Sequence, residues 1–223
     1  MNKLYFSNYP DKTKPFERGK PMRGILRKLS TYRVFAYPFP FIVMAITPYK
    51  ETGYQFIMWP SGVALILFGV CIRIWATKNI GKRIPWMKKK GKELVKTGPY
   101  AIVRNPLYSG NILITTGLSF ISELVWIIPF IFFYFFTLYH LIAIYEEKKL
   151  LERWGDNYRD YLNDVPRWIP RLKNLHIIKG DGFGWKQALR YEIPSFIFIF
   201  FGIFIFILKD YGLLYRVYRL CIF

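Results

Sequence analysis

Residues 92–110 read KELVKTGPYAIVRNPLYSG, and this stretch separates two apolar segments of the chain. Gly98-Pro99 indicates a turn, because proline fixes φ while glycine frees the backbone beside it. Asn105-Pro106 predicts a helix start, with Asn105 as the N-cap and Pro106 at the first helical position, where a missing N–H costs nothing. A helix that begins here presents free backbone amides, which attract carboxylates and phosphates.

The apolar runs on both sides predict an all-α, multi-pass transmembrane protein with about five spans. Of the 223 residues, 53% are hydrophobic and 20% aromatic, which is too apolar for an ordinary soluble domain. The predicted spans are residues 34–48, 57–76, 106–122, 124–145 and 193–208. The first run is short and contains two prolines, so it is either a kinked span or a re-entrant piece. The third and fourth form a helical hairpin with its tip near Glu123.

Charge sets the expected partner and orientation. The chain has 33 Lys and Arg against 14 Asp and Glu, and the basic residues flank the apolar runs, which favours an anionic membrane surface over nucleic acid. Residues 78–104 hold nine basic residues and only Glu93, so the positive-inside rule places them in the cytoplasm. Residues 1–33 are interpreted as a basic cytoplasmic arm or a partly disordered tail. Arg73, near the inner end of a span, is expected to snorkel to the surface.

The remaining residues, 34–223, are predicted to form one membrane-embedded domain with a core motif region at 77–170. The two cysteines form no disulfide framework or zinc spacing, and we expect no metal site. Folding of the hairpin brings residues 100–110 beside Glu146-Glu147 at its cytoplasmic base. This convergence predicts a single site there.

Two blocks of residues resemble one family. The first is Leu94-Val95, Gly98 and Tyr100 followed by Arg104-Asn105-Pro106, Tyr108 and Gly110; the second is Glu146-Glu147, Leu150, Trp154-Gly155, Tyr158, Tyr161 and Val165-Pro166. In this order they resemble the signature of the isoprenylcysteine carboxyl methyltransferase and phospholipid methyltransferase group of integral-membrane enzymes. The resemblance covers roughly residues 92–170 and is specific because both blocks are present.

The resemblance implies S-adenosyl-L-methionine as the cofactor and a lipid-like acceptor that enters from the bilayer. Aligning a nucleophile with the cofactor's methyl group in a water-excluding pocket is then the protein's task. The cofactor contacts that the resemblance implies are Lys92, Leu94, Val95, Tyr100, Asn105, Pro106, Leu107, Tyr108 and Glu146. The candidate catalytic residues are Glu147, His140, Arg104 and Arg167.

Each of these residues also has a structural interpretation. Tyr100 and Tyr108 are alternatively aromatic residues of the membrane interface. Glu146 and Glu147 are alternatively a solvated helix face that pairs with basic residues at helical spacing. His140 is either a general base or a hydrogen-bonding partner of a neighbouring helix.

The chain departs from the family pattern at two positions. Asn105 stands where the family has histidine, and we expect its side chain to cap the following helix. Ile142 stands where the isoprenylcysteine branch has an arginine that suits a substrate carboxylate. Either Arg104 or Arg167 replaces that arginine, or the acceptor is an amine, a thiol or another group. The alternative functions are an NADPH-dependent membrane reductase of related fold and a non-catalytic membrane protein that retains the fold.

Overall fold

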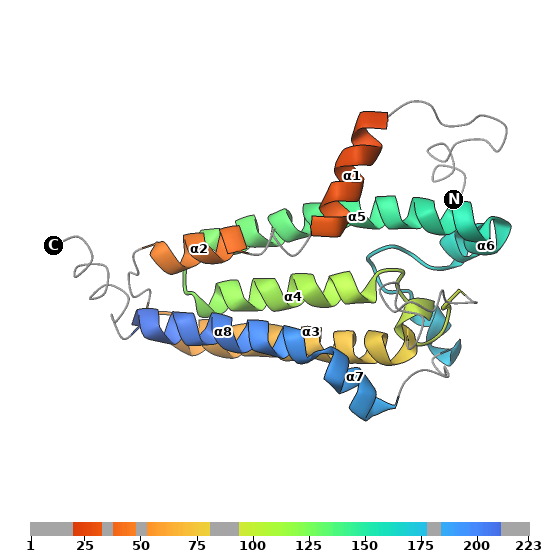
Figure 1. Ribbon diagram of the computed structural model, residues 1–223. Helices are drawn as coiled ribbons and strands as arrows, with labels where there is room; N and C mark the ends of the chain where they lie inside the picture. The colour runs from red at the N-terminus through yellow and green to blue at the C-terminus, as the bar shows by residue number, and fades with distance from the viewer. Residues whose placement is uncertain (1–19, 33–37, 48–52, 81–93, 178–183, 211–223) are drawn as a thin grey trace.

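The computed structural model describes residues 20–32, 38–47, 53–80, 94–177 and 184–210. These residues form helices and no strand, which confirms the all-α class for the described part of the chain. Four helices lie lengthwise beside one another (Figure 1): α3 (Gln55–Ile80), α4 (Pro106–Ile121), α5 (Ile127–Trp154) and α8 (Ile193–Asp210). Shorter helices surround them: α1 (Lys20–Tyr32), α2 (Pro38–Ile46), α6 (Asp156–Asp164) and α7 (Trp185–Tyr191).

The lengths of the helices support fewer membrane spans than expected. Among the described residues, α3 and α5 are long and apolar enough to cross a membrane, and α7 with α8 gives a third span if the pair, bent by 52°, is counted as one. The 16 residues of α4 reach roughly 24 Å and the nine of α2 roughly 14 Å, against a bilayer core of about 30 Å. The predicted total of five spans is therefore not confirmed.

The predicted hairpin is present, but its second arm, α5, begins at Ile127 instead of residue 124 and also ends later than predicted. Its first arm, α4, ends at Ile121, one residue before the predicted end. The second arm does not stop at Tyr145 but runs on through the charged motif to Trp154. Gly155, with φ of 53°, adopts the left-handed conformation that ends the helix there. The acidic motif therefore lies on the same rigid helix as the predicted span.

Helices α3 and α4 are antiparallel and pack through glycines spaced seven residues apart on each. A Cβ on Gly69 would lie 2.7 Å from the carbonyl oxygen of Gly110, and one on Gly117 would lie 2.6 Å from that of Gly62. Such close backbone approach through small residues is typical of helices that associate in membranes. The arrangement fixes the position of α4, and with it the helix start at Pro106.

We expect Gly69→Ala to destabilise the fold by about 1–3 kcal/mol, because the added methyl group meets a backbone oxygen that cannot rotate away. Gly24 in α1 is the matched control, since a Cβ there meets nothing within 4 Å. Thermal unfolding in detergent measures both variants. Equal midpoints for Gly69→Ala and Gly24→Ala would contradict the close packing.

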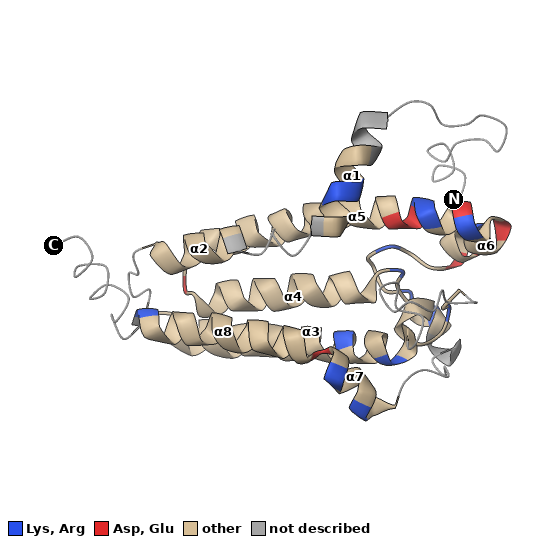
Figure 2. Ribbon diagram, viewed as in Figure 1, with Lys and Arg blue, Asp and Glu red and all other residues tan. Residues whose placement is uncertain are grey.

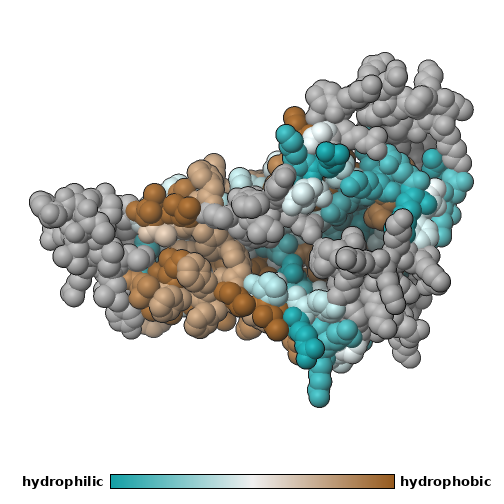
Figure 3. Space-filling model, in the orientation of Figure 1, coloured by the Kyte–Doolittle hydropathy of each residue, from teal (hydrophilic) through white to brown (hydrophobic). Residues whose placement is uncertain are grey.

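The two ends of the bundle differ in polarity. Figure 2 shows charged residues gathered where α5 meets α6 and around α7, while the long helices are mostly uncharged along their length. Figure 3 shows a hydrophobic surface over the opposite part of the molecule. Apolar side chains on α8 are exposed there, including Phe196, Phe200 and Phe204. This distribution is that of a protein embedded in a membrane with one polar end.

Glu123 and Lys209 are charged residues at the apolar end of the described part of the chain, and both have partners. Glu123 at the hairpin tip is 2% exposed and accepts a hydrogen bond from Trp59 Nε1 at 2.9 Å. Lys209 lies in the last turn of α8. It is 8% exposed, and its ammonium donates to the carbonyl of Met44 at 2.8 Å, near the C-terminal end of α2. A cation is favourable at that end of a helix.

Candidate functional site

The segment between α3 and α4 is held against the segment that follows α6. Gly98 has φ of 64°, a conformation that favours glycine, and begins the 3-10 helix η4 (Gly98–Ala101). The backbone N–H of Arg104 donates to Pro166 at 2.9 Å, and the N–H of Arg171 donates to Ile102 at 3.0 Å. These hydrogen bonds bring the two sequence blocks together at the polar end of the hairpin, as the sequence predicted.

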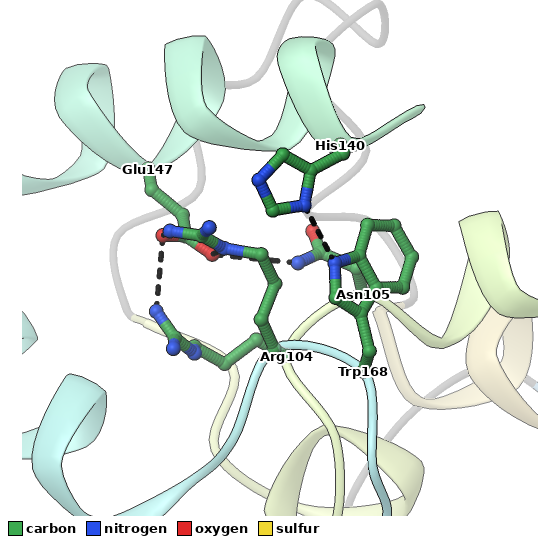
Figure 4. A network of polar contacts seen from close by, with 6 residues as sticks. Arg104, Asn105, His140, Glu147 and Trp168 are labelled. Atoms are coloured by element: carbon green, nitrogen blue, oxygen red, sulfur yellow. Dashed lines mark hydrogen bonds and ion pairs between the residues drawn. The ribbon is translucent and has the colours of Figure 1, made fainter. Parts of the chain in front are cut away.

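Glu147 is the centre of one buried ion cluster. Its side chain is 3% exposed, and Arg167 donates to both of its carboxylate oxygens, at 3.0 Å from Nε and 2.7 Å from Nη2. Arg104 Nη1 donates to Oε2 at 3.0 Å. Figure 4 shows Glu147 directed from α5 toward the segment that carries Arg104. Both arginines proposed as substrate clamps are thus engaged by Glu147, and the three charges leave the cluster net positive.

Asn105 does not cap α4, so the expected role of its side chain is wrong. It occupies the N-cap position but makes no side-chain cap hydrogen bond. Its amide Nδ2 instead donates to Glu147 Oε1 at 3.4 Å, and Figure 4 shows the amide turned toward that cluster. A cap would need the side-chain oxygen of Asn105 to accept from a backbone N–H of α4, and no such hydrogen bond is present.

This geometry predicts how variants at Asn105 behave. We expect Asn105→His to retain stability, because an imidazole N–H reaches the carboxylate of Glu147 as the amide does. Asn105→Ser is too short for that contact and is expected to cost about 1 kcal/mol, although serine is a good cap. Thermal unfolding in detergent separates the two cases. A serine variant more stable than the histidine variant would restore the capping role.

Glu146 has a different environment from its neighbour. It is half-buried, and its Oε2 accepts a hydrogen bond from the hydroxyl of Tyr108 at 2.7 Å. Its Oε1 accepts a long bond of 3.4 Å from Ser30 in α1, so part of the predicted arm is a helix that packs on α5. Both of these donors are hydroxyl groups, whereas guanidinium groups contact Glu147.

Tyr100 lies in η4 with a buried hydroxyl that has no hydrogen-bond partner. Its backbone carbonyl accepts from the hydroxyl of Tyr161 at 2.7 Å. Burial raises the pKa of Tyr100 well above its ordinary value, and the nearby Tyr161 adds to this. Burial also raises the pKa of Tyr161. Tyr100 is therefore a neutral phenol. Because a buried hydroxyl normally has a hydrogen-bond partner, this hydroxyl is a candidate donor to a ligand.

His140 has the geometry of a structural residue. Its Nδ1 accepts a hydrogen bond from Trp168 Nε1 at 3.0 Å, and its ring stacks with Trp168 at a centroid distance of 6.1 Å (Figure 4). A neutral imidazole that accepts at Nδ1 carries its proton on Nε2, so neither nitrogen is free to take a proton. This contact favours the bonding role over the general base.

The other predicted contacts occupy varied positions. Lys92 lies outside the described residues. Leu94 and Val95 are half-buried, and the side chain of Leu94 packs against Tyr158 and Tyr161 of α6. Pro106 is buried and Leu107 half-buried in the first turn of α4. Ile142 is fully buried in the apolar core, so no polar clamp occupies that position.

Sequence reasoning missed a second polar cluster. Arg73 does not snorkel: Nε forms an ion pair of 2.8 Å with Glu192, and Nη1 donates to Asn111. Glu192 is 3% exposed and lies between α7 and α8. The available signal was the presence of two ionisable residues, Arg73 and Glu192, within or beside apolar runs, since such residues normally have a partner or a function.

The comparisons with known proteins agree with this geometry. The model of the phospholipid methyltransferase family matches residues 58–157, from the start of α3 to the start of α6. A nickel-cobalt-cadmium resistance protein, NccN of Alcaligenes xylosoxydans xylosoxydans, is 32% identical over 111 residues, which are 50% of this chain and 47% of that protein. A cobalt-zinc-cadmium resistance protein, CzcN of Cupriavidus metallidurans, is 29% identical with the same shares.

The chain thus spans about half the length of the curated relatives it matches. No solved structure matches it significantly. The matched segment contains α3, the α4–α5 hairpin, both acidic motif residues and the residues from Leu94 to Tyr108. Residues 58–157 of the chain are thus similar to the phospholipid methyltransferase family.

Proposed function

We propose that this protein transfers a methyl group from S-adenosyl-L-methionine to a lipid-like or membrane-soluble acceptor. One observation carries the proposal: Tyr108 and Glu146, from the two halves of the family signature, meet at 2.7 Å at the polar end of an apolar hairpin. The similarity of residues 58–157 to the phospholipid methyltransferase family supports this reaction class. The exposed apolar surface of the helices supports an acceptor that arrives from the bilayer.

The residues present fit the cofactor. When bound, it supplies an electrophilic methyl group on a cationic sulfonium. Glu146 offers a half-buried carboxylate for its ammonium group or ribose hydroxyls, and the Tyr100 hydroxyl offers a buried donor. Lys92, Leu94, Val95, Asn105, Pro106, Leu107 and Tyr108 complete the proposed contacts.

The same geometry gives Glu146 and Glu147 different roles. Glu147 is held by two arginines, so we infer that it orients the segment 104–108 and does not remove a proton. Arg104 and Arg167 share that role and keep the cluster net positive. An anionic part of the cofactor or the acceptor would be favoured beside this cluster. The alternative acceptors are an amine, a thiol or another nucleophile.

The proposal is tested by calorimetric titration of detergent-solubilised protein with S-adenosylhomocysteine and with NADPH. Binding of S-adenosylhomocysteine without NADPH supports a methyltransferase. Binding of NADPH alone would support the related reductase, and binding of neither would support a non-catalytic protein. The names of the two relatives refer to metal resistance, but the described residues contain no group of three or more His, Cys, Asp or Glu placed to hold a metal ion.

We also propose that the protein is multi-pass and that the site faces the cytoplasm, because residues 78–104 are strongly basic. Val125, exposed at the hairpin tip, and Asn157, exposed in α6, lie at opposite ends of α5. In intact cells, a cysteine at 125 is expected to react with an impermeant reagent, while one at 157 reacts only after permeabilisation. The reverse pattern would place the site outside.

A further inference from the structure

Glu192 lies outside the segment that matches the family, and both of its carboxylate oxygens accept hydrogen bonds. Its Oε2 accepts from Arg73 Nε at 2.8 Å and from Ser195 Oγ at 2.9 Å, and its Oε1 accepts from Thr77 Oγ1 at 2.5 Å. The family match ends at residue 157. A later part of the chain thus inserts a buried charge against α3.

A continuous path of contacts leads from Glu192 to Glu146. Arg73 donates to Asn111 Oδ1, and Asn111 Nδ2 donates to the hydroxyl of Tyr139 at 2.9 Å. The ring of Tyr139 stacks on that of Tyr108, with centroids 4.8 Å apart and planes 19° apart. Tyr108 then donates to Glu146 at 2.7 Å. The path crosses α3, α4 and α5.

Each step of the path fixes the next one. Since Arg73 has only donors, the oxygen of Asn111 must face it, and the amide nitrogen must face Tyr139. Tyr139 is 1% exposed and Tyr108 is 8% exposed, so neither ring can move without disturbing the core. Glu192 neutralises Arg73, which would otherwise be a charge in an apolar helix. The carboxylate therefore controls the position of the tyrosine that holds Glu146.

The unpartnered hydroxyl of Tyr100 lies within the electrostatic reach of both ends of the path. Arg73, Glu146 and Glu192 all act on it. The buried donor and the path thus belong to one region, formed by η4, α3, α4, α5 and the start of α8. This supports a role at the ligand site and not only in anchoring the last helix.

We propose that Glu192 is a positioning residue of the cofactor site. The inference rests on the proposed function. Through Arg73, Asn111 and Tyr139, Glu192 keeps Tyr108 in place against Glu146. By this inference, α7 and α8 contribute to the cofactor site although they lie outside the matched segment.

Calorimetry with S-adenosylhomocysteine on the full chain in detergent tests this, using Glu192→Gln, Tyr108→Phe and the double variant. We expect Glu192→Gln to raise the Kd about tenfold. In the double variant the two effects should not add, because Tyr108→Phe already removes the end of the path. Glu152→Gln, an exposed site on α5, is the control and should leave the Kd unchanged. Unfolding midpoints are measured for all variants.

If Glu192→Gln does not fold, Tyr139→Phe tests the same path of contacts. It removes only the hydroxyl oxygen and keeps the ring, and we expect it to raise the Kd as well. A folded Glu192→Gln or Tyr139→Phe protein with the wild-type Kd would overturn the inference. Additive effects of Glu192→Gln and Tyr108→Phe would do the same. Wild-type protein that binds no S-adenosylhomocysteine would instead refute the proposed function, so the two failures are distinguishable.

Discussion

Replacing Glu146 with alanine is expected to abolish detectable binding of S-adenosylhomocysteine, whereas replacing Glu152 with alanine leaves it unchanged. Both residues are carboxylates on α5, but Glu146 is half-buried beside Tyr108 and Glu152 is exposed. Removing one partner of a buried charge contact costs about 2–5 kcal/mol of binding free energy. That loss is about 30-fold or more in Kd.

A second variant separates the charge of Glu146 from its shape. Glu146→Gln keeps an oxygen that accepts from Tyr108 but carries no charge for the ligand's ammonium. We expect its Kd to lie between those of wild type and Glu146→Ala. Calorimetry measures all three, with unfolding midpoints to confirm that each variant is folded. Equal affinity for the Glu146→Ala and Glu152→Ala proteins would show that Glu146 is a surface residue.

Local signals in the sequence were sufficient to predict that the two helices of the hairpin exist and where α4 begins. Pro106 sets the first residue of α4, and a run of apolar residues sets its length, so the predicted and observed bounds differ by one residue. The end of α5 was misplaced because charged residues do not stop a helix. A residue with positive φ ends a helix, and Gly155 is the first residue after the start of α5 that has one. The helical class followed from the apolar runs, whereas five spans stay a prediction because α2 and α4 are shorter than a bilayer core is thick.

The partners of charged residues could not be predicted in the same way. Arg73 and Glu192 are 119 residues apart, and no local pattern relates them. Asn105 was expected to cap a helix because that is its best local role, but tertiary packing placed a buried carboxylate within its reach. The family signature located the two blocks, and the structure showed that one acidic residue pairs with arginines and the other with hydroxyls.

The strongest effect on folding is expected for Glu147→Ala. This change leaves Arg104 and Arg167, whose side chains are 12% and 21% exposed, without their shared carboxylate. Breaking a buried ion pair by removing one partner costs about 3–5 kcal/mol, and a chain of this size loses about 2–4 °C per kcal/mol. The unfolding midpoint in detergent should therefore fall by roughly 10 °C.

Glu152→Ala is the matched control for this prediction too, and should shift the midpoint by less than about 2 °C because exposed substitutions rarely matter. Glu147→Gln should give an intermediate loss, since the amide retains one acceptor for two guanidinium groups. The prediction depends on Glu147 being a structural counterion. A Glu147→Ala protein with the wild-type midpoint but no methyl transfer would contradict it, because the two arginines would then be stable alone and the carboxylate would be needed for the chemistry itself.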